Sequence, residues 1–469
     1  MFNKISDDIA AKLKAAAGEQ YVLMGDAIGA DFSHDEKALY GANAPEAVVY
    51  ATSTEQVAAI LKVCNENNVP VTPRGAGTGL VGGSVPVEGG VVLCTGKMDK
   101  IVSYDEEAMT VTVQPGVLLS DLTADAAGKG FLYAPDPGEK TATVGGNVST
   151  NAGGPMAVKY GSTRDSVLNL TAVLPTGEIV KLGCDVSKDN SGYSLMHLVI
   201  GSEGTLAVVT EMTLKLNPAP KASLGFILPF SDMETCIAAA AMLKKSGLNP
   251  DTLEFMDKEI VKLSTDFTGV PVFPLDAGGE PVEALLLTEF TGESDEELEV
   301  LMEKFAELTE ESGCLDILVI DNPTLRKSVK EAHDAFHTSV ESAAKLCDEA
   351  NSAVPTAKLA EYLAFAKEQA AANGLTMQNF GHAGDGNAHI YVYNDELAEA
   401  DFRAAAKTFM DALYAKCAEM GGSVSAEHGV GRGKAGYLAE ASGEAKMRVM
   451  RGIKAAFDPN GILNPGKIC

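Results

Sequence analysis

The sequence predicts an α+β protein, and two features of its pattern carry that prediction. Between residues 40 and 220, short alternating segments typical of strands dominate, and glycine is frequent. After NPAPK (217–221) the order becomes strand, helix, strand, strand, helix, strand, which is typical of a ferredoxin-like sheet with helices on one face. We therefore predict a first domain over 1–220, a second over 221–420, and a tail over 421–469 that packs back on one of them.

The first domain opens with an amphipathic helix. Ile5, Ile9 and Leu13 fall four apart, Ser6 can cap the first turn, and Gly18 ends the run. A second helix is predicted over 53–68, where Ser53 and Gln56 have capping-box spacing. Strands are expected at 69–73, 89–94, 100–104, 109–116, 170–182 (two strands joined by a turn) and 204–216.

The second domain shows longer elements. We predict strands at 224–230, 251–257, 283–290 and 314–321, with helices at 231–247 and 294–312. Ser231 with Glu234, and Ser294 with Glu297, have the spacing of capping boxes at the two helix starts. Further helical stretches are expected near 324–347 and 357–373.

Composition excludes several classes of partner. The formal charge of −28 at pH 7 makes nucleic acid and anionic membranes poor partners. The eight cysteines occur singly without C-x-x-C spacing, which argues against an iron–sulfur cluster or a disulfide framework. Apolar runs fall short of the roughly 20 residues needed to span a bilayer, so we expect no transmembrane segment. We predict a cytoplasmic protein and leave peripheral attachment open.

The stretch GTGLVG (77–82) formally matches the G-x-G-x-x-G dinucleotide fingerprint, but its context argues against a Rossmann unit. A Rossmann loop leads directly into a helix, whereas GSVPVEGGVVLC follows here. Glycines can still let backbone N–H groups converge on a phosphate, and Arg74 could add a positive charge. A plain tight turn is the competing interpretation.

A second glycine block, TATVGGNVSTNAGGPMAVKYG (141–161), strengthens the prediction of a cofactor. Its glycines would let the backbone approach a flat ring, and Asn147, Thr150 and Asn151 offer hydrogen bonds. One such block alone favours a turn. Two in one domain favour a bound cofactor.

The stretch GHAGDGNAHI (381–390) places two histidines around a turn. His389 begins an alternating strand, and Asp385-Gly386 favours a turn that brings His382 beside it. SAEHGVG (425–431) supplies Glu427 and His428, which would complete a metal site of two imidazoles and one carboxylate. Spacing alone leaves open whether the two segments meet, and histidines hydrogen-bonded in a core are the alternative. His333 and His337, four apart on a helix among charged residues, are interpreted as a surface pair.

These motifs occur together in a characteristic order: RGAGTGL, PDPGEKTATVGGNVSTNAGGPMAVKYG, VIGSEGTLAVVTE, GHAGDGNAH, EHGVGRGK and AFDPNGILNPGK. The chain resembles, over nearly its whole length, the FAD-linked 2-hydroxyacid dehydrogenases of the glycolate oxidase D-subunit and D-lactate dehydrogenase type. The resemblance implies a vanillyl-alcohol-oxidase type flavoprotein fold. It also implies an FAD-binding domain of two α+β subdomains, a ferredoxin-like cap domain, and a C-terminal segment that returns to the FAD domain.

The resemblance implies that Arg74–Leu80 surround the FAD pyrophosphate and that the second block lines the flavin. The full expected cofactor set is Pro73, Arg74, Gly75, Ala76, Gly77, Thr78, Gly79, Leu80, Pro137, Gly138, Thr143, Gly145, Gly146, Asn147, Thr150, Asn151, Gly153, Tyr160, Gly161, Glu203, Gly204, Val209 and Asn464. Neither His nor Cys occurs in 70–80 or 137–161, so we expect FAD to be bound non-covalently.

The resemblance also assigns the histidine motifs. It implies that His382, His389 and Glu427 bind one divalent metal ion, that His428 is the catalytic base, and that Arg326 binds the substrate. We expect Asn387 also to contact substrate. Iron, zinc and manganese all suit two nitrogens and one oxygen, so the metal stays open.

We therefore expect oxidation of a small D-2-hydroxy acid, with D-lactate favoured and glycolate or D-2-hydroxyglutarate as alternatives. Electrons would leave through a separate carrier; we favour an electron-transferring flavoprotein over quinone or an iron–sulfur subunit. A flavin-free metal-dependent hydrolase is an alternative from another class, but it leaves both glycine blocks unexplained. A non-catalytic scaffold subunit is a third.

Overall fold

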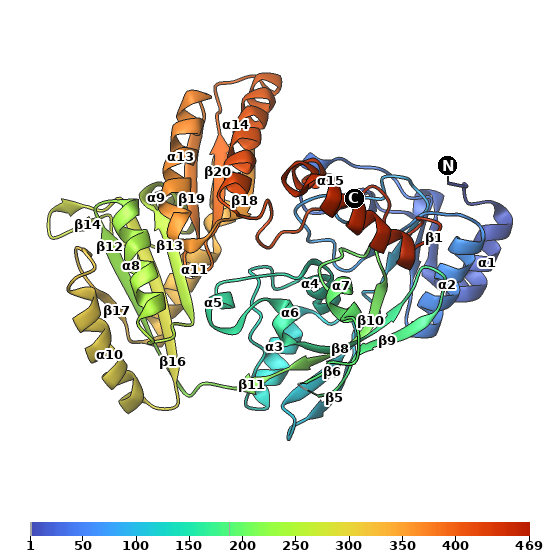
Figure 1. Cartoon of the computed structure of the whole chain (residues 1–469), viewed down its shortest axis with the longest axis horizontal. Helices are drawn as coiled ribbons and strands as arrows, with labels where there is room; N and C mark the ends of the chain where they lie inside the picture. Colours follow the sequence, from blue (N-terminus) through green and yellow to red (C-terminus); the bar gives the residue numbers. More distant parts are fainter. Residues whose placement is uncertain (1, 187) are drawn as a thin grey trace. The chain divides into compact units, whose positions relative to one another are not determined.

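The computed structural model describes residues 2–186 and 188–469, and its contacts divide the chain into two compact units (Figure 1). Unit 1 contains the residues up to Gly153, then Gly161–Ala219 and Glu427–Cys469; unit 2 contains Gly154–Tyr160 and Pro220–Ala426. The first division expected from the sequence lay at 220 and the second at 420. In the structure the last boundary between the units lies between Ala426 and Glu427, and the tail that follows belongs to unit 1.

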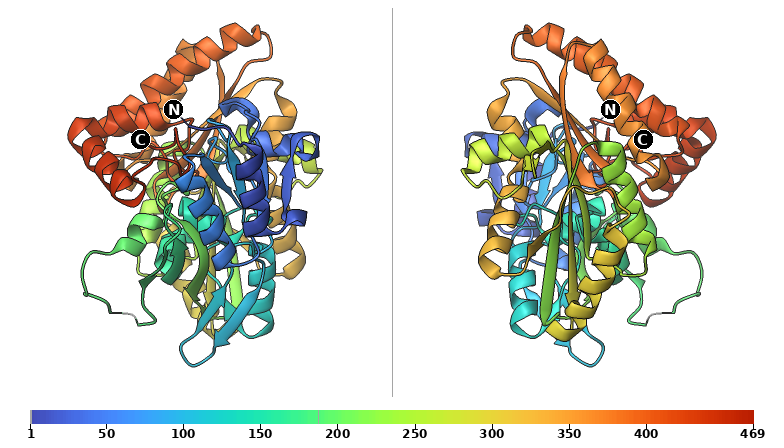
Figure 2. Two further views of the ribbon diagram at one scale, coloured as in Figure 1. Left: turned by 90° about the vertical axis from the view of Figure 1, so that its right-hand side faces the viewer. Right: turned by 90° about the vertical axis from the view of Figure 1, so that its left-hand side faces the viewer.

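Unit 1 contains two main sheets. The first has the order β1-β2-β4-β3, in which β2, β4 and β3 are parallel and β1 is antiparallel. The second is antiparallel in the order β5-β6-β10-β8-β9, and the loop between β5 and β6 projects from one end of it (Figure 2). The strands are β1 Val22–Met24, β2 Ala47–Tyr50, β3 Val71–Arg74, β4 Val91–Cys94, β5 Ile101–Asp105, β6 Thr110–Val113, β8 Val167–Val173, β9 Ile179–Gly183 and β10 Val208–Lys215, with a small ladder of β7 Phe131–Leu132 and β11 Asn217–Pro218.

Each sheet of unit 1 has its own apolar core. One core joins the first sheet to α1 and α2 through Leu13, Ile60 and Leu93, and the other joins the second sheet to α3 and α4. The helices are α1 Asp7–Ala17, α2 Thr54–Glu66, α3 Leu119–Gly128, α4 Val144–Thr150, α6 Thr163–Ser166, α7 Leu195–Val199 and α15 Ala435–Phe457, with 3-10 turns at Glu19–Tyr21, Gly25–Ala27, Ala30–Ser33 and Ala38–Tyr40. The division of unit 1 into two α+β subdomains stays a prediction.

Hydrogen bonds bear out the N-caps expected in unit 1. Ser6 Oγ accepts from the Ile9 amide at 3.4 Å, and Ser53 Oγ accepts from the Gln56 amide at 3.3 Å. The Gln56 side chain reaches the Thr52 amide at 2.8 Å, one residue further back than a capping box requires.

The C-terminal tail is secured to unit 1 by a buried carboxylate and a backbone bridge. Asp458, 2% exposed, accepts hydrogen bonds from the Ile462 amide (3.2 Å) and the Leu463 amide (2.8 Å), and Lys454 Nζ lies 2.5 Å from it. Leu463 forms a parallel bridge with Val71 on β3. These bonds satisfy both the buried charge and the amides of a segment without regular structure.

Unit 2 is built on one seven-stranded sheet in the order β17-β12-β16-β13-β19-β20-β18, antiparallel at every pairing. Its first four strands have the ferredoxin-like order, which agrees with the sequence prediction. The last three strands extend that sheet on the β13 side. The strands are β12 Ala222–Phe230, β13 Thr252–Asp257, β16 Ala284–Gly292, β17 Leu318–Ile320, β18 Cys347–Ala353, β19 Thr376–His382 and β20 Asn387–Tyr393, with a separate hairpin of β14 Asp276–Ala277 and β15 Glu280–Pro281.

Helices cover both faces of this sheet, not one face as expected. Phe226 of β12 packs on Phe305 of α10, whereas the next residue, Ile227, belongs to a core with α9, α11 and α12 on the opposite face. Helix α9 follows β13 directly and was absent from the predicted order. The helices are α5 Ala157–Tyr160, α8 Met233–Lys245, α9 Lys258–Thr268, α10 Asp295–Thr309, α11 Pro323–Asp334, α12 Phe336–Ala343, α13 Leu359–Ala372 and α14 Glu399–Glu419, with a 3-10 turn at Thr356–Lys358.

Two further details differ from the sequence prediction. The N-cap of α8 is Asp232, whose carboxylate accepts from the Thr235 amide at 2.7 Å, so the expected Ser231/Glu234 capping box is wrong by one residue. The second glycine block is not only turns, since its residues 144–150 form helix α4. Within the described ranges, no helix combines the length and the apolar character that a bilayer crossing requires.

We predict that Phe305→Ala destabilises unit 2 by about 3–5 kcal/mol, because the ring is 1% exposed and its centroid lies 3.9 Å from that of Phe226. Val300→Ala on the same helix is the matched control. Val300 is 53% exposed, so the change should stay within about 0.5 kcal/mol. Urea unfolding of the purified protein would measure both, and equal effects would contradict this description of the core.

Candidate active site

The first glycine block follows β3 and begins at a buried arginine. Arg74 is 8% exposed, donates from Nη1 to the His34 carbonyl at 2.7 Å, and lies 5.6 Å from the centroid of the Phe32 ring. Gly77 has φ +85° and lies so close to the guanidinium that a Cβ would overlap it. As expected, no helix follows this loop, and the next element is β4.

The two glycine blocks adjoin each other. A side chain on Gly75 would overlap the hydroxyl of Thr143, the residue that caps α4 by accepting from the Gly146 amide at 3.2 Å. Gly145, in the first turn of α4, packs against Pro115, whose carbonyl oxygen would lie 2.8 Å from an added Cβ. The structure thus brings Gly75, expected near the FAD pyrophosphate, together with Thr143, expected near the flavin, within unit 1.

Buried polar atoms without protein partners mark the same region. Among the described residues, the amide nitrogen of Asn147, which is 4% exposed, has no acceptor, and the buried Ser202 hydroxyl has no partner. An unpaired buried polar group is costly and is normally satisfied by water or a ligand. These atoms and the glycine cradle fit a polar planar group such as a flavin.

Other residues of the expected cofactor set are bonded to the protein itself. Asn151, in the left-handed conformation, accepts from Ser162 Oγ (3.1 Å) and the Arg164 amide (2.9 Å). Asn464 donates to the carbonyls of Gly83 (3.1 Å) and Glu203 (2.8 Å). Their contacts shape the cradle, and their contact with a cofactor stays a prediction.

Several other members of the set have contacts or positions that the structure defines. Gly204 packs against Pro73, Thr150 Oγ1 donates to the Gly146 carbonyl, and Val209 lies on β10. Gly153 lies against Glu427, whose Oε2 would be 2.8 Å from an added Cβ. Of the set, Tyr160 alone falls in unit 2, on the short insertion Gly154–Tyr160.

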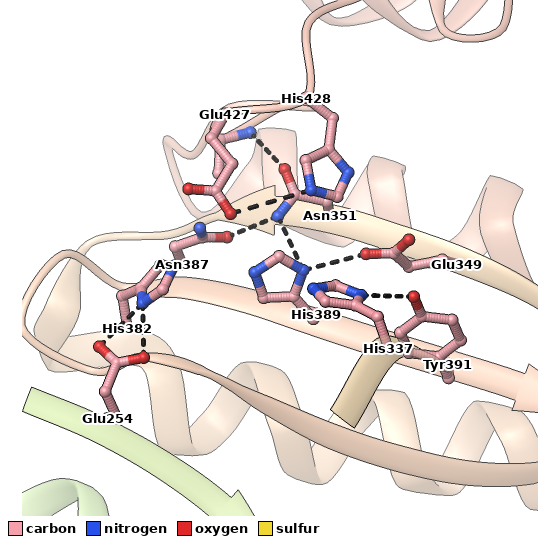
Figure 3. A network of polar contacts seen from close by, with 11 residues as sticks. Glu254, His337, Glu349, Asn351, His382, Asn387, His389, Tyr391, Glu427 and His428 are labelled. Carbon is pink, nitrogen blue, oxygen red and sulfur yellow. Dashed lines mark hydrogen bonds and ion pairs between the residues drawn. The ribbon is translucent and has the colours of Figure 1, made fainter. Parts of the chain in front are cut away.

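The predicted pair of histidines meets on the sheet of unit 2 (Figure 3). His382 ends β19 and His389 lies on β20, and a turn with Gly386 at φ +70° joins the strands. The imidazole centroids are 5.6 Å apart, and both side chains are 10% exposed or less. The strand alternation and the G-D-G turn therefore placed these residues as predicted.

A buried carboxylate holds each of the two imidazoles. His382 Nδ1 lies 2.7 and 2.8 Å from the oxygens of Glu254, and His389 Nδ1 lies 3.0 Å from Glu349. Burial alone would raise the pKa of Glu254, but the charges and hydrogen bonds of His382 and His333 lower that pKa to about 2. An ionised carboxylate only accepts hydrogen bonds, so Nδ1 of His382 carries a proton toward Glu254. This is the arrangement typical of metal-binding histidines.

The interpretation of His333 and His337 as a surface pair is wrong. The His333 side chain is 18% exposed and its Nε2 lies 3.5 Å from Glu254. His337 packs edge-on against His389 with centroids 4.9 Å apart, and its Nδ1 lies 2.6 Å from the Tyr391 hydroxyl. Ligand atoms of His337, Glu349 and His389 lie within 4.8 Å of one another. His333 lies on α11 and His337 on α12, and both side chains contact residues of the sheet.

Two asparagines connect the cluster to the chain segment before Glu427. Asn351 donates to Asn387 Oδ1 at 3.0 Å, and its Nδ2 lies 3.4 Å from His389 Nδ1. Asn351 Oδ1 accepts from the Ala426 amide at 3.3 Å, which fixes the last residue of unit 2. Glu427 follows directly, and its carboxylate lies 3.8 Å from the His428 imidazole.

Arg326, expected to bind substrate, has protein partners. Its guanidinium forms an ion pair with Glu289 at 3.2 Å and donates to the carbonyls of Ser223 (2.9 Å) and Ile320 (3.3 Å). These bonds secure α11 to the edge of the sheet. The substrate role of Arg326 stays a prediction.

Sequence reasoning missed Glu254, Glu349 and Asn351. All three lie on strands, at positions 128, 40 and 38 residues from the histidine that each contacts. A weak signal exists, since Glu254 is an acid within the otherwise apolar run LEFM.

Two family descriptions match the chain. "FAD linked oxidases, C-terminal domain" covers residues 219–468, and "FAD binding domain" covers residues 45–183, a range that holds both glycine blocks. The chain is 51% identical to a D-lactate dehydrogenase of Anaerostipes hadrus over 468 residues, which cover 100% of this chain and 98% of that protein. It is 33% identical to the glycolate oxidase subunit GlcD of Bacillus subtilis, with 99% and 97% of the two chains covered.

The chain belongs to the FAD-linked oxidases. Among solved structures, p-cresol methylhydroxylase with bound substrate aligns over 98% of this chain and 96% of its own, with a TM-score of 0.78 at 18% identity. At that identity the likeness shows the fold, which is of the vanillyl-alcohol-oxidase type. The protein is therefore an FAD-linked oxidoreductase, as the motif order implied.

We predict that Asn147→Ala weakens FAD binding by about 1–3 kcal/mol, the cost of losing a buried hydrogen bond. The thermal stability of the flavin-free protein should change little, because Asn147 Nδ2 has no protein partner to lose. Flavin titration of deflavinated protein would measure the affinity. Unchanged affinity in the variant would show that this amide does not face the cofactor.

Proposed function

We propose that this protein oxidises D-lactate to pyruvate, with FAD as the electron acceptor and a divalent metal ion as a second cofactor. The observation that carries the proposal is the pair of buried imidazoles whose Nδ1 atoms are held by carboxylates, in a chain with a flavin-binding unit. The relative named D-lactate dehydrogenase, 51% identical over the full chain, supports the choice of substrate.

The proposed metal ligands are His382, His389 and Glu427. The two imidazoles would bind the ion through Nε2 in their neutral form, and Glu427 follows a residue that is hydrogen-bonded to Asn351 of the same cluster. A divalent ion held there would bind the hydroxyl and carboxylate oxygens of a 2-hydroxy acid and make the hydroxyl proton more acidic. Iron, zinc and manganese all suit these donors.

The proposed base is His428, beside Glu427. Oxidation of a 2-hydroxy acid removes a proton from the hydroxyl and a hydride from C2, leaving a 2-oxo acid. An imidazole with a pKa near neutrality can take the proton at physiological pH. FAD, held non-covalently by the two glycine blocks, supplies the acceptor for the hydride when bound.

Asn387 and Arg326 are the proposed substrate contacts. Asn387 is 4% exposed and shares the cluster with His389 through Asn351, so its amide is already oriented. Arg326 would have to exchange its ion pair with Glu289 for the substrate carboxylate. We propose that the reduced protein passes its electrons to a separate carrier, an electron-transferring flavoprotein.

Anaerobic addition of D-lactate to the purified, metal-loaded protein should bleach the oxidised flavin bands. L-lactate should not, because a fixed metal and base accept one configuration at C2. Glycolate and D-2-hydroxyglutarate, run in parallel, should bleach more slowly. Mixing the reduced protein with electron-transferring flavoprotein should restore the bands faster than mixing with a quinone.

The outcomes separate the alternatives. Fastest bleaching by glycolate, the substrate class suggested by the name of the Bacillus subtilis relative, would move the assignment to that acid. A purified protein without flavin absorbance that hydrolyses a substrate would favour the hydrolase alternative. Rapid reoxidation by quinone alone would reject the proposed carrier.

Metal removal should abolish D-lactate-dependent bleaching while FAD stays bound, and a divalent ion should restore it. His382→Ala should lose most of the metal measured by elemental analysis. His197→Ala is the matched control, because His197 is not a proposed ligand and pairs with Ser194 at 2.6 Å. Full activity after verified metal removal, or full metal content in the His382 variant, would contradict the metal proposal.

A further inference from the structure

A buried glutamate of unit 1 holds the backbone just after the proposed base. Glu203, 8% exposed, lies in the loop between α7 and β10. Its Oε1 accepts from the Val430 amide and its Oε2 from the Gly431 amide, each at 2.7 Å. One carboxylate thus binds two successive amides of the segment that begins at Glu427. Successive amides that converge on an anion form a strong and directional contact.

Glu203 is itself fixed at both ends of its backbone. Its amide donates to the Ser149 carbonyl of α4 at 2.7 Å, and its carbonyl accepts from Asn464 at 2.8 Å. It adopts φ +52°, a conformation that a glutamate rarely takes unless its surroundings require it. The carboxylate is therefore aimed from a rigid position beside the second glycine block.

Two glycines, Gly429 and Gly431, flank Val430 where this segment meets Glu203. An added Cβ on Gly429 would lie 3.0 Å from the Glu203 carboxyl carbon, and Gly429 has φ +86°. Gly431, with φ +48°, lies against the Val81 carbonyl. These glycines let the turn close on the carboxylate.

Amide donors and cations surround the buried carboxylate of Glu203. Burial raises the pKa of Glu203 above its usual value, although the two amide hydrogen bonds and the charges of Lys467 and Lys434 act to lower it. Lys467 is 2% exposed and donates to the Val85 carbonyl at 2.7 Å. The Glu203 carboxylate therefore has two amide donors and two lysine charges near it.

We propose that Glu203 is a positioning residue that sets the place of the His428 imidazole by holding the Val430 and Gly431 amides. The proposal rests on the proposed function, in which His428 is the base. Val430 is two residues from His428, so a shift of the turn moves the imidazole directly. The Glu203 carboxylate accepts its hydrogen bonds from the Val430 and Gly431 amides, so its proposed effect on His428 runs through this turn.

The test compares Glu203→Gln with wild type as purified holoenzyme. A glutamine can accept at one oxygen, but its NH₂ group then faces the second amide, donor against donor. We expect kcat per bound FAD for D-lactate to fall about 10- to 100-fold, as small misplacements of catalytic groups do, with little change in KM. Turnover is expressed per bound FAD because Glu203 also belongs to the expected cofactor set. Amide hydrogen exchange in the peptide containing Val430 and Gly431 should become faster.

Asp458→Asn is the matched control. Asp458 is another buried carboxylate of unit 1 that accepts from two successive amides, but those amides are Ile462 and Leu463. It should lower the thermal midpoint without a comparable fall in kcat per bound FAD. A similar fall in both variants would overturn the positioning role, because general loosening of unit 1 would then explain it.

A double variant separates this proposal from the proposed function. If Glu203 acts through His428, Glu203→Gln should slow wild type but not His428→Ala, since interacting residues are non-additive. Equal slowing in both backgrounds, or no slowing in wild type, would overturn the proposal. A His428→Ala protein with wild-type turnover would instead refute His428 as the base, whatever Glu203→Gln does to amide exchange.

Discussion

The central interaction in this molecule is a buried carboxylate that accepts N–H hydrogen bonds. Glu203 and Asp458 hold backbone amides of the C-terminal tail, and Glu254 and Glu349 hold imidazole nitrogens in unit 2. A carboxylate removed from water is costly unless it is fully bonded, so each one fixes its donors strongly. The same chemistry therefore holds the tail in place and turns Nδ1 of His382 toward Glu254.

The chain passes from unit 2 back to unit 1 between Ala426 and Glu427. Unit 1 contains the two glycine blocks, Glu427 and His428, and unit 2 contains His382 and His389. The Ala426 amide donates a hydrogen bond to Asn351, and the next residue, Glu427, lies against Gly153. The two residues that follow Ala426 are the proposed ligand Glu427 and the proposed base His428.

Local patterns predicted what depends on local geometry. The period of two in 387–393 and the G-D-G turn placed His382 and His389 together, and the lack of a helix after 77–82 correctly excluded a Rossmann loop. Helix α4 escaped prediction because two glycines lower its propensity, whereas the Thr143 cap and packing on Pro115 stabilise it. Glu254 and Glu349 escaped because strand pairing, not sequence spacing, brings them to the histidines. His333 and His337 were predicted wrongly because their charged neighbours in sequence do not show which side of each helix, α11 or α12, packs on the sheet.

The most direct measurement of the central claim, hydride transfer from C2 of D-lactate to bound FAD, is a primary isotope effect in a single turnover. Anaerobic flavin reduction would be followed by stopped flow with saturating D-lactate, either unlabelled or deuterated at C2. Since the C2–H bond breaks in the step that reduces the flavin, deuterium should slow reduction several-fold. Equal rates of reduction by the two isotopologues would contradict the account.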